Sequence, residues 1–160
     1  MSESVARAAL ASISPFFIVR DILPSIAFYR DLLGFELTFL GPEDDPYFAI
    51  LCRNGVQLMI KAILPEVPPL PNPLRHPWAR WDAFVYTPDP DLLAAELLAR
   101  EVKMHAPLAD NSDNLRGFEV QDVDGYVLFF GRPLGAAVTK ATGNPEATGN
   151  PEATGDDDAA

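Results

Sequence analysis

The segment from Phe118 to Phe130, FEVQDVDGYVLFF, constrains the fold of this chain more than any other segment. Two apolar runs flank Asp122-Val123-Asp124-Gly125, where the glycine suits a tight turn with positive φ. The pattern predicts a β-hairpin that ends in a nearly continuous apolar strand. This hairpin closes the second of two similar rounds of elements, each with the pattern of a strand, a helix and then several strands.

The first round is expected over residues 13–63. The β-rich run from Ile13 to Val19 predicts a strand, and Asp21 predicts the start of a helix that a proline in its first turn can tolerate. That helix is expected to end at Gly34. Three strands should follow, and Asn54-Gly55 is a strong hairpin turn between the last two.

A Pro-rich segment, residues 64–80, is expected to link the two rounds and to form neither a helix nor an interior strand. The second round is expected over residues 81–134. Asp89 followed by Pro90 is typical of an N-cap and first-turn pair. A short strand over Val102–Ala106 and a loop, ADNSDNLRG, should precede the closing hairpin.

Both ends of the chain look different from the body. Residues 1–12 are expected to form a flexible N-terminus. Residues 135–160 contain the repeat ATGNPE and no large apolar side chain beyond the first few positions. Such a segment cannot bury enough surface to offset the entropy of ordering it, so the sequence predicts a disordered low-complexity tail.

The duplicated βαβββ pattern resembles the vicinal oxygen chelate superfamily, which includes glyoxalase I, ring-cleaving dioxygenases, fosfomycin-resistance enzymes and bleomycin-binding proteins. The resemblance is carried by residues 19–35, VRDILPSIAFYRDLLGF, and by Asp122 to Phe130, which is similar to the superfamily's terminal D-x-D-G-x-x-x-E hairpin. It implies an α+β fold in which two βαβββ modules form a curved mixed sheet around a concave groove. It is less specific for function, because the superfamily hosts unrelated chemistries.

The superfamily's chemistry implies a divalent metal held by His and Glu side chains from both modules. Carried over onto this chain, the ligand positions are Ser14, Gln57 or Met59, Asp82 or Trp81, and Phe129. At most one of these four positions holds a side chain that could bind a hard cation. The sequence therefore predicts no metal, no other cofactor and no catalytic residue carried over from the superfamily.

Aromatic side chains take the place of those ligands. Alternation along each module's first strand puts several of them on one face, and Phe129 would join them from the closing hairpin. The predicted ligand-binding residues are Phe16, Met59, Trp81, Asp82, Phe84, Tyr86 and Phe129. An aromatic concavity with one carboxylate suits a flat or cationic organic ligand. The alternative is that the rings only fill the concave face as core.

The composition limits which classes of partner are expected. The net charge is −11, and no basic stripe exists to neutralise phosphates, so nucleic acid is not an expected partner. No apolar run approaches the ~20 residues that cross a bilayer, so no membrane is expected either. The N-terminus lacks a secretory signal and Cys52 is the single cysteine, which together favour a cytoplasmic protein. Open sheet edges and a half-built groove favour a homodimer.

Three functions remain open on this basis. The first is a metal-independent small-molecule-binding protein that sequesters a cationic or aromatic, antibiotic-like ligand, as the bleomycin-binding members of the superfamily do. The second is a lyase, isomerase or dioxygenase-type enzyme with an atypical site, with Asp82 or Glu119 as a possible base. The third is a regulatory module whose dimer surface is its main function.

Overall fold

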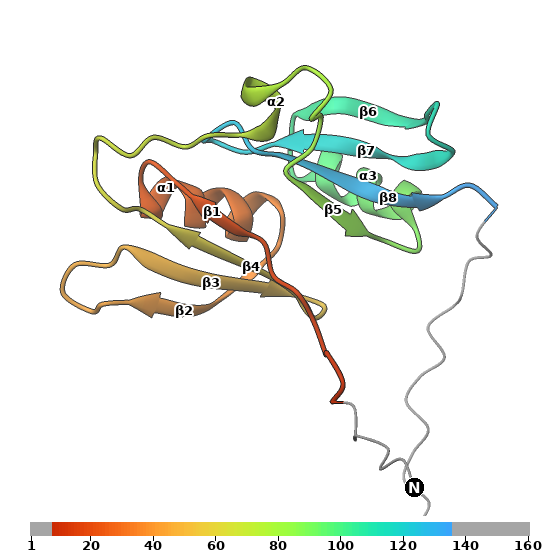
Figure 1. The fold of residues 1–160 in the computed structure, drawn as a ribbon. Helices are drawn as coiled ribbons and strands as arrows, with labels where there is room; N and C mark the ends of the chain where they lie inside the picture. The colour runs from red at the N-terminus through yellow and green to blue at the C-terminus, as the bar shows by residue number, and fades with distance from the viewer. Residues whose placement is uncertain (1–7, 136–160) are drawn as a thin grey trace, which may run out of the picture.

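The computed structural model describes residues 8–135, which form two modules of similar element order (Figure 1). The elements of the first module are β1 (Phe16–Ile18), α1 (Ile22–Ala27), the π-helical turn η1 (Phe28–Leu32), β2 (Glu36–Gly41), β3 (Phe48–Arg53) and β4 (Val56–Lys61). After the short helix α2 (Asn72–Arg75), the second module consists of β5 (Ala83–Tyr86), α3 (Pro90–Ala99), β6 (Met104–Asp110), β7 (Leu115–Gln121) and β8 (Val127–Pro133).

Each module builds its own four-stranded mixed sheet. The strand orders are β1-β4-β3-β2 and β5-β8-β7-β6, and the first strand of each module runs parallel to the last. The other neighbours are antiparallel. The predicted α+β fold of two βαβββ modules is therefore confirmed, with two sheets in place of one continuous sheet.

Local signals position the helices as expected. Asp21 caps α1 by accepting a hydrogen bond from the backbone N–H of Leu23 at 3.2 Å, and Asp89 caps α3 by accepting one from Leu92 at 2.9 Å. The chain turns after η1 at Gly34, whose φ is +71°. Glycine adopts a positive φ at little energetic cost. The hairpin turn between β3 and β4 lies at Asn54-Gly55, both with positive φ, as the sequence indicates.

Two expectations about local structure were wrong. The Pro-rich segment contains the four-residue helix α2, because its proline falls in the first turn, where a missing N–H costs no hydrogen bond. Strand β6 continues to Asp110, and β7 already starts at Leu115. The expected loop of residues 109–117 is therefore mostly a hairpin, whose ends pair with each other, Ala109 with Gly117 and Asp110 with Arg116.

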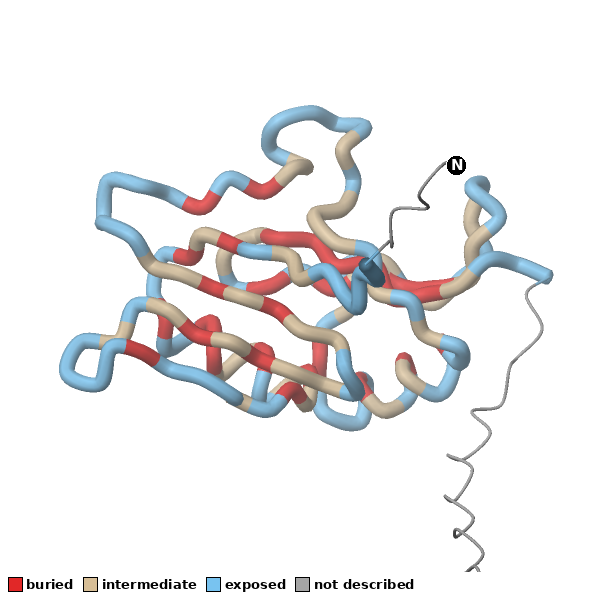
Figure 2. Tube along the Cα trace, turned by 60° about the horizontal axis from the view of Figure 1, so that its bottom comes forward, coloured by how far each residue is buried: buried red, intermediate tan, exposed pale blue. Residues whose placement is uncertain are grey.

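One hydrophobic core serves both modules. Side chains from α1, α3 and the helix-facing side of each sheet form a single buried cluster, which includes Phe17, Leu51, Leu97, Phe118 and Phe130. Buried positions alternate with more exposed ones along most strands (Figure 2), as expected for sheets covered on one face. We call the opposite face of each sheet its outer face.

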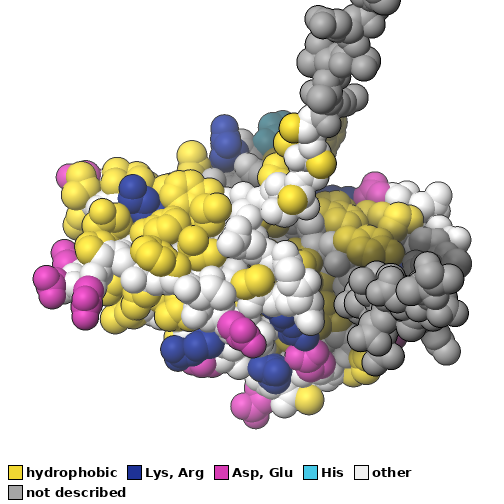
Figure 3. Space-filling view, turned by 90° about the horizontal axis from the view of Figure 1, so that it is seen from below, with side chains coloured by type: hydrophobic (Ala, Val, Ile, Leu, Met, Phe, Trp, Pro, Cys, Tyr) yellow, Lys and Arg dark blue, Asp and Glu magenta, His cyan; other side chains and the backbone are white. Residues whose placement is uncertain are grey.

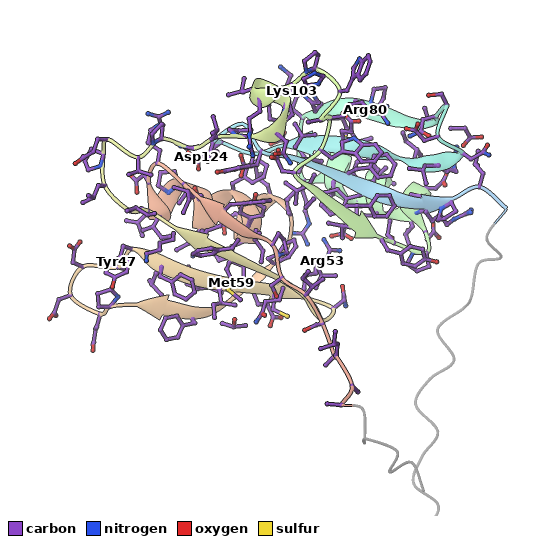
Figure 4. All side chains as sticks on the ribbon, in the orientation of Figure 1. Tyr47, Arg53, Met59, Arg80, Lys103 and Asp124 are labelled. Atoms are coloured by element: carbon purple, nitrogen blue, oxygen red, sulfur yellow. The ribbon has the colours of Figure 1, made fainter. Side chains whose placement is uncertain are left out.

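The turn between β7 and β8 joins the modules. Asp122 accepts a hydrogen bond from the hydroxyl of buried Tyr29 at 2.6 Å, and Asp124 accepts one from Ser25 Oγ at 2.8 Å. The hydroxyl of Tyr126 donates to the carbonyl of Ile18 at 2.7 Å. Asp124 lies where this turn approaches α1 (Figure 4). The D-x-D-G segment thus has a structural role, because it fixes the second module to the first.

Within residues 8–135 no helix is long and apolar enough to cross a membrane. The predicted disordered tail, apart from its first residue, and the first seven residues of the predicted flexible N-terminus lie outside the described residues.

Candidate functional site

Four of the predicted site residues form two strand pairs, one on each outer face. Phe16 pairs in register with Met59 across β1 and β4, and Phe84 pairs in register with Phe129 across β5 and β8. The two pairs occupy equivalent positions in the two modules. A ligand site built from all of them would need both outer faces, so we describe each face separately.

Three rings form what we call the outer aromatic cluster of the second module: Trp81, Phe84 and Phe129. Trp81 and Phe129 stack with ring centroids 4.4 Å apart, and Phe84 lies 5.2 Å from Phe129. Phe84 is 45% exposed, whereas Phe129 is 3% exposed. The cluster therefore has a buried centre and an accessible rim.

Phe129 is buried because its ring lies against two paired glycines. Gly117 on β7 and Gly131 on β8 are register partners, and a Cβ atom on either would lie within 2.5 Å of the Phe129 ring. Any larger residue would fill the space that the ring uses. Phe129 therefore supports the cluster from below, since its ring is packed between the glycine pair and Trp81.

The outer face of the second module also carries a carboxylate, Glu119. Glu119 lies on β7 directly opposite Phe129. Its Oε1 accepts a hydrogen bond from Trp81 Nε1 at 2.6 Å, and its Oε2 lies 4.0 Å from His105 Nε2. The Glu119 side chain is 17% exposed, so it is a largely buried acceptor at the edge of an aromatic surface. From the sequence, Glu119 is expected only as a candidate base, and neither its pairing with Trp81 nor its proximity to His105 can be predicted, because both depend on strand register.

The outer face of the first module is also aromatic. Phe16 and Phe39 both contact Phe48, with centroid separations of 6.0 and 5.8 Å, and Lys61 lies 5.5 Å from the ring of Tyr47. Phe16 and Phe39 are each about half exposed, at 51% and 50%. Figure 4 places Met59 on this sheet, and Figure 3 shows hydrophobic side chains gathered over the first module on the left, with a second patch over the other module on the right.

Asp82 is placed differently from the aromatic residues. Its Oδ1 accepts a hydrogen bond from the backbone N–H of Asn72 at 2.6 Å, and its Oδ2 accepts one from Val127 at 2.8 Å. Both oxygens are therefore engaged in joining the linker to the start of β8. Asp82 and Phe16 also share the lining of a cavity of about 300 Å³ between β1 and the linker.

Tyr86, 52% exposed, lies at the mouth of a larger cavity of about 500 Å³ between the modules. Val56, Leu93 and Phe130 supply apolar walls. At its rim Arg53 donates to Glu96 at 2.7 Å, and Figure 4 shows Arg53 between the two modules. The cavity is large enough for a small organic molecule.

The positions to which the resemblance assigns the superfamily's metal ligands hold few donor atoms. Ser14 Oγ donates a hydrogen bond to Gln57 Oε1 at 2.8 Å, so these two side chains satisfy each other. Phe129 supplies no donor, and Asp82 is bonded to backbone N–H groups. Among residues 8–135 no three His, Cys, Asp or Glu side chains are grouped so that they could hold a metal ion.

Comparison with protein families gives one match. Residues 10–130 match the family described as the Glyoxalase/Bleomycin resistance protein/Dioxygenase superfamily. A comparison with curated proteins finds no match.

Several solved structures have a similar fold. TioX from Micromonospora sp. ML1 superposes with a TM-score of 0.61 at 18% identity, over 78% of this chain and 99% of TioX. The bleomycin-binding protein of bleomycin-producing Streptomyces verticillus, complexed with copper(II)-bleomycin, gives a TM-score of 0.58 at 25% identity, over 78% of this chain and 97% of that protein. TnmS3, an antibiotic-binding protein from Streptomyces sp. CB03234, gives 0.55 at 22% identity, over 79% and 99% of the two chains.

Proposed function

The chain belongs to the Glyoxalase/Bleomycin resistance protein/Dioxygenase superfamily, and from that premise we propose that it binds a small organic molecule without a metal ion. The ligand is a flat aromatic or cationic molecule of the antibiotic type, held on the outer aromatic cluster of the second module. The observation that carries this proposal is the pairing of Trp81 Nε1 with Glu119 at 2.6 Å beside stacked aromatic rings.

Metal independence is supported by the chemistry of the donors. A divalent ion in this superfamily needs imidazole and carboxylate ligands from both modules. Here the corresponding positions offer a hydroxyl and an amide that bond each other, a phenyl ring, and a carboxylate that accepts two backbone N–H groups. These residues do not fit a divalent metal.

The class of ligand is supported by the cluster itself. Phe84 and Trp81 provide aromatic surface that a planar ligand can stack on, and Glu119 provides negative charge at its edge. Glu119 is better placed for this role than Asp82, whose two oxygens already have partners. Two of the structures that share this fold are proteins that bind bleomycin or another antibiotic.

We further propose that two copies of the chain form a homodimer that closes the groove. The outer face of the first module exposes Phe16, Phe39 and Tyr47, which is more aromatic surface than an isolated sheet face needs. A second copy that places this face opposite the outer aromatic cluster would form, with the cluster, the two walls of a groove that holds the ligand. Light scattering should give twice the mass of one chain at about 20 µM, and a monomer would contradict the dimer.

The location proposed for this protein is the cytoplasm. The single cysteine, Cys52, is a half-buried free thiol on β3, which suits a reducing compartment.

Calorimetric titration with metal-free bleomycin and with a planar aromatic cation, both in excess EDTA, tests the proposal. Wild-type protein should bind at least one of these two probes. Phe84→Ala should weaken that binding about 5- to 150-fold, since truncating an aromatic ring that contacts a ligand typically costs about 1–3 kcal/mol. Glu119→Gln should weaken binding of the cation more at low salt than at high salt.

The matched control is Leu92→Arg, because Leu92 is 68% exposed and lines the cavity between the modules. If Phe84→Ala still binds the probe and Leu92→Arg does not, the ligand site is that cavity and not the outer aromatic cluster. Binding that is lost in EDTA and restored by a divalent metal would overturn metal independence.

The alternative is a lyase or isomerase that uses Glu119 as a base. The observation in its favour is His105, whose Nε2 lies 4.0 Å from Glu119 Oε2 on the same face. Turnover of α-keto or thiol-adduct substrates that disappears in both Glu119→Gln and His105→Ala would establish this function in place of simple binding.

A further inference from the structure

The residue before Trp81 is a cation that lies on its ring. The guanidinium carbon of Arg80 is 4.7 Å from the centroid of the Trp81 ring. The guanidinium also forms an ion pair with Asp113, in the turn between β6 and β7. Arg80 and Asp113 are 45% and 47% exposed, so the pair lies at the surface of the second module.

Within residues 8–135, the interactions that hold Arg80 are individually weak. A cation over an exposed ring and a solvent-exposed ion pair each contribute little to stability, because water competes for both charges. The indole, by contrast, is fixed: Phe129 stacks on it at 4.4 Å and Glu119 accepts its N–H at 2.6 Å. A ligand could therefore displace the guanidinium and leave the ring in place.

The surroundings of Arg80 specify what can replace it. A planar cation in its place would stack on the indole and would meet the carboxylate that Arg80 leaves, Asp113, as well as Glu119 at the edge of the ring. A neutral ring would displace Arg80 and leave Asp113 without a partner. Charge and shape both favour a planar, positively charged ligand.

We propose that Arg80 is a built-in competitor for the ligand cation: it occupies the cation position on Trp81 in the free protein and is displaced by planar aromatic cations. This rests on the proposed function, because it assumes that the outer aromatic cluster is the binding site. It makes Arg80 and Asp113 the residues that set affinity and charge selectivity there.

Fluorescence titration with N-methylacridinium, a planar cation, tests the proposal, with neutral acridine at about pH 8 as the uncharged probe of the same shape. Arg80→Ala should raise the affinity for N-methylacridinium about 3- to 10-fold, which corresponds to the range of a single cation–π contact. The double variant Arg80→Ala/Asp113→Asn should lose most of that gain. Acridine should bind more weakly than the cation to Arg80→Ala.

Removing any positive charge favours a cationic probe slightly, so the matched control is Arg30→Ala. Arg30 is an exposed arginine of the first module that also pairs with an aspartate, Asp31. Arg30→Ala should change the affinity less than 2-fold. An equal gain in both arginine variants would reduce the effect to net charge and overturn the proposal.

Trp81→Phe separates failure of this inference from failure of the proposed function. This variant keeps an aromatic ring in the cluster but removes the N–H that donates a hydrogen bond to Glu119. If Trp81→Phe weakens binding and Arg80→Ala leaves it unchanged or weaker, the site stands and the competitor role is wrong. If no variant of Trp81, Phe84 or Arg80 affects binding, the proposed function fails as well.

Discussion

The hydroxyl of Tyr29 in the first module donates a 2.6 Å hydrogen bond to Asp122 Oδ2 in the second. Tyr29 is fully buried, and Asp122 is 6% exposed. The other oxygen of Asp122 accepts the backbone N–H groups of Asp124 and Tyr126, which shapes the turn between β7 and β8. One carboxylate thus holds the turn and also attaches it to the other module.

This arrangement predicts a dependence of stability on pH. Burial is the main cause that raises the pKa of Asp122 from 3.8 to about 6, against the lowering effect of its hydrogen bonds. The folded state therefore binds this proton more tightly than the unfolded state does. The resulting stabilisation is fully present below about pH 4 and is lost as the pH rises through about 6.

Asp122→Asn removes this titration while keeping the shape of the side chain. The free energy of unfolding of the wild type, relative to the variant, should fall by about 2 kcal/mol between about pH 4 and pH 7. Denaturant unfolding of both proteins at several pH values measures it. Parallel pH profiles for the two proteins would show that Asp122 does not titrate in this range.

The outer aromatic cluster should divide into a structural ring and a binding ring. Phe129→Ala removes a ring that is 3% exposed and should destabilise the fold by about 3–5 kcal/mol. Phe84→Ala removes a ring that is 45% exposed and should cost less than about 1.5 kcal/mol. Thermal unfolding of both variants decides this, and equal losses would mean that the cluster is simply core.

Asp82→Asn should reduce stability without affecting the binding of a cation. The amide that replaces one oxygen would face a backbone N–H, from Asn72 or from Val127, and lose that hydrogen bond. The expected loss is about 1–3 kcal/mol, since a buried donor is left without a partner. If instead stability is unchanged and cation affinity drops at low salt, Asp82 belongs to the ligand site.

Gly117→Ala should disturb the packing of the Phe129 ring. A Cβ atom at this position would lie 2.4 Å from Phe129 Cζ and 2.4 Å from the carbonyl oxygen of Phe130, so the ring and the strand must both move. We expect a loss of about 1–3 kcal/mol by chemical denaturation. Part of the clash is with the Phe129 ring. The double variant Gly117→Ala/Phe129→Leu should therefore lose less stability than the sum of the losses in the two single variants.

Much of the fold can be predicted from the sequence because its signals are local. Asp21 and Asp89 cap the helices, and Asn54-Gly55 forms the predicted hairpin turn, since each depends only on residues a few positions away. Strict alternation in the first strand of each module also placed Phe16 and Phe84 on outer faces. The aromatic nature of the candidate site followed from that alternation.

The role of each site residue was decided by tertiary structure, because it depends on partners distant in sequence. Asp82 and Glu119 are both acidic residues near aromatic ones, yet Asp82 joins the linker to β8 while Glu119 binds the indole of Trp81. Phe84 and Phe129 belong to similar apolar runs, and only the pairing of two glycine-bearing strands buries the second. The sequence by itself determined which residues alternate and where the chain turns. Strand register and the packing of one module on the other determined which of those residues are left exposed to meet a ligand.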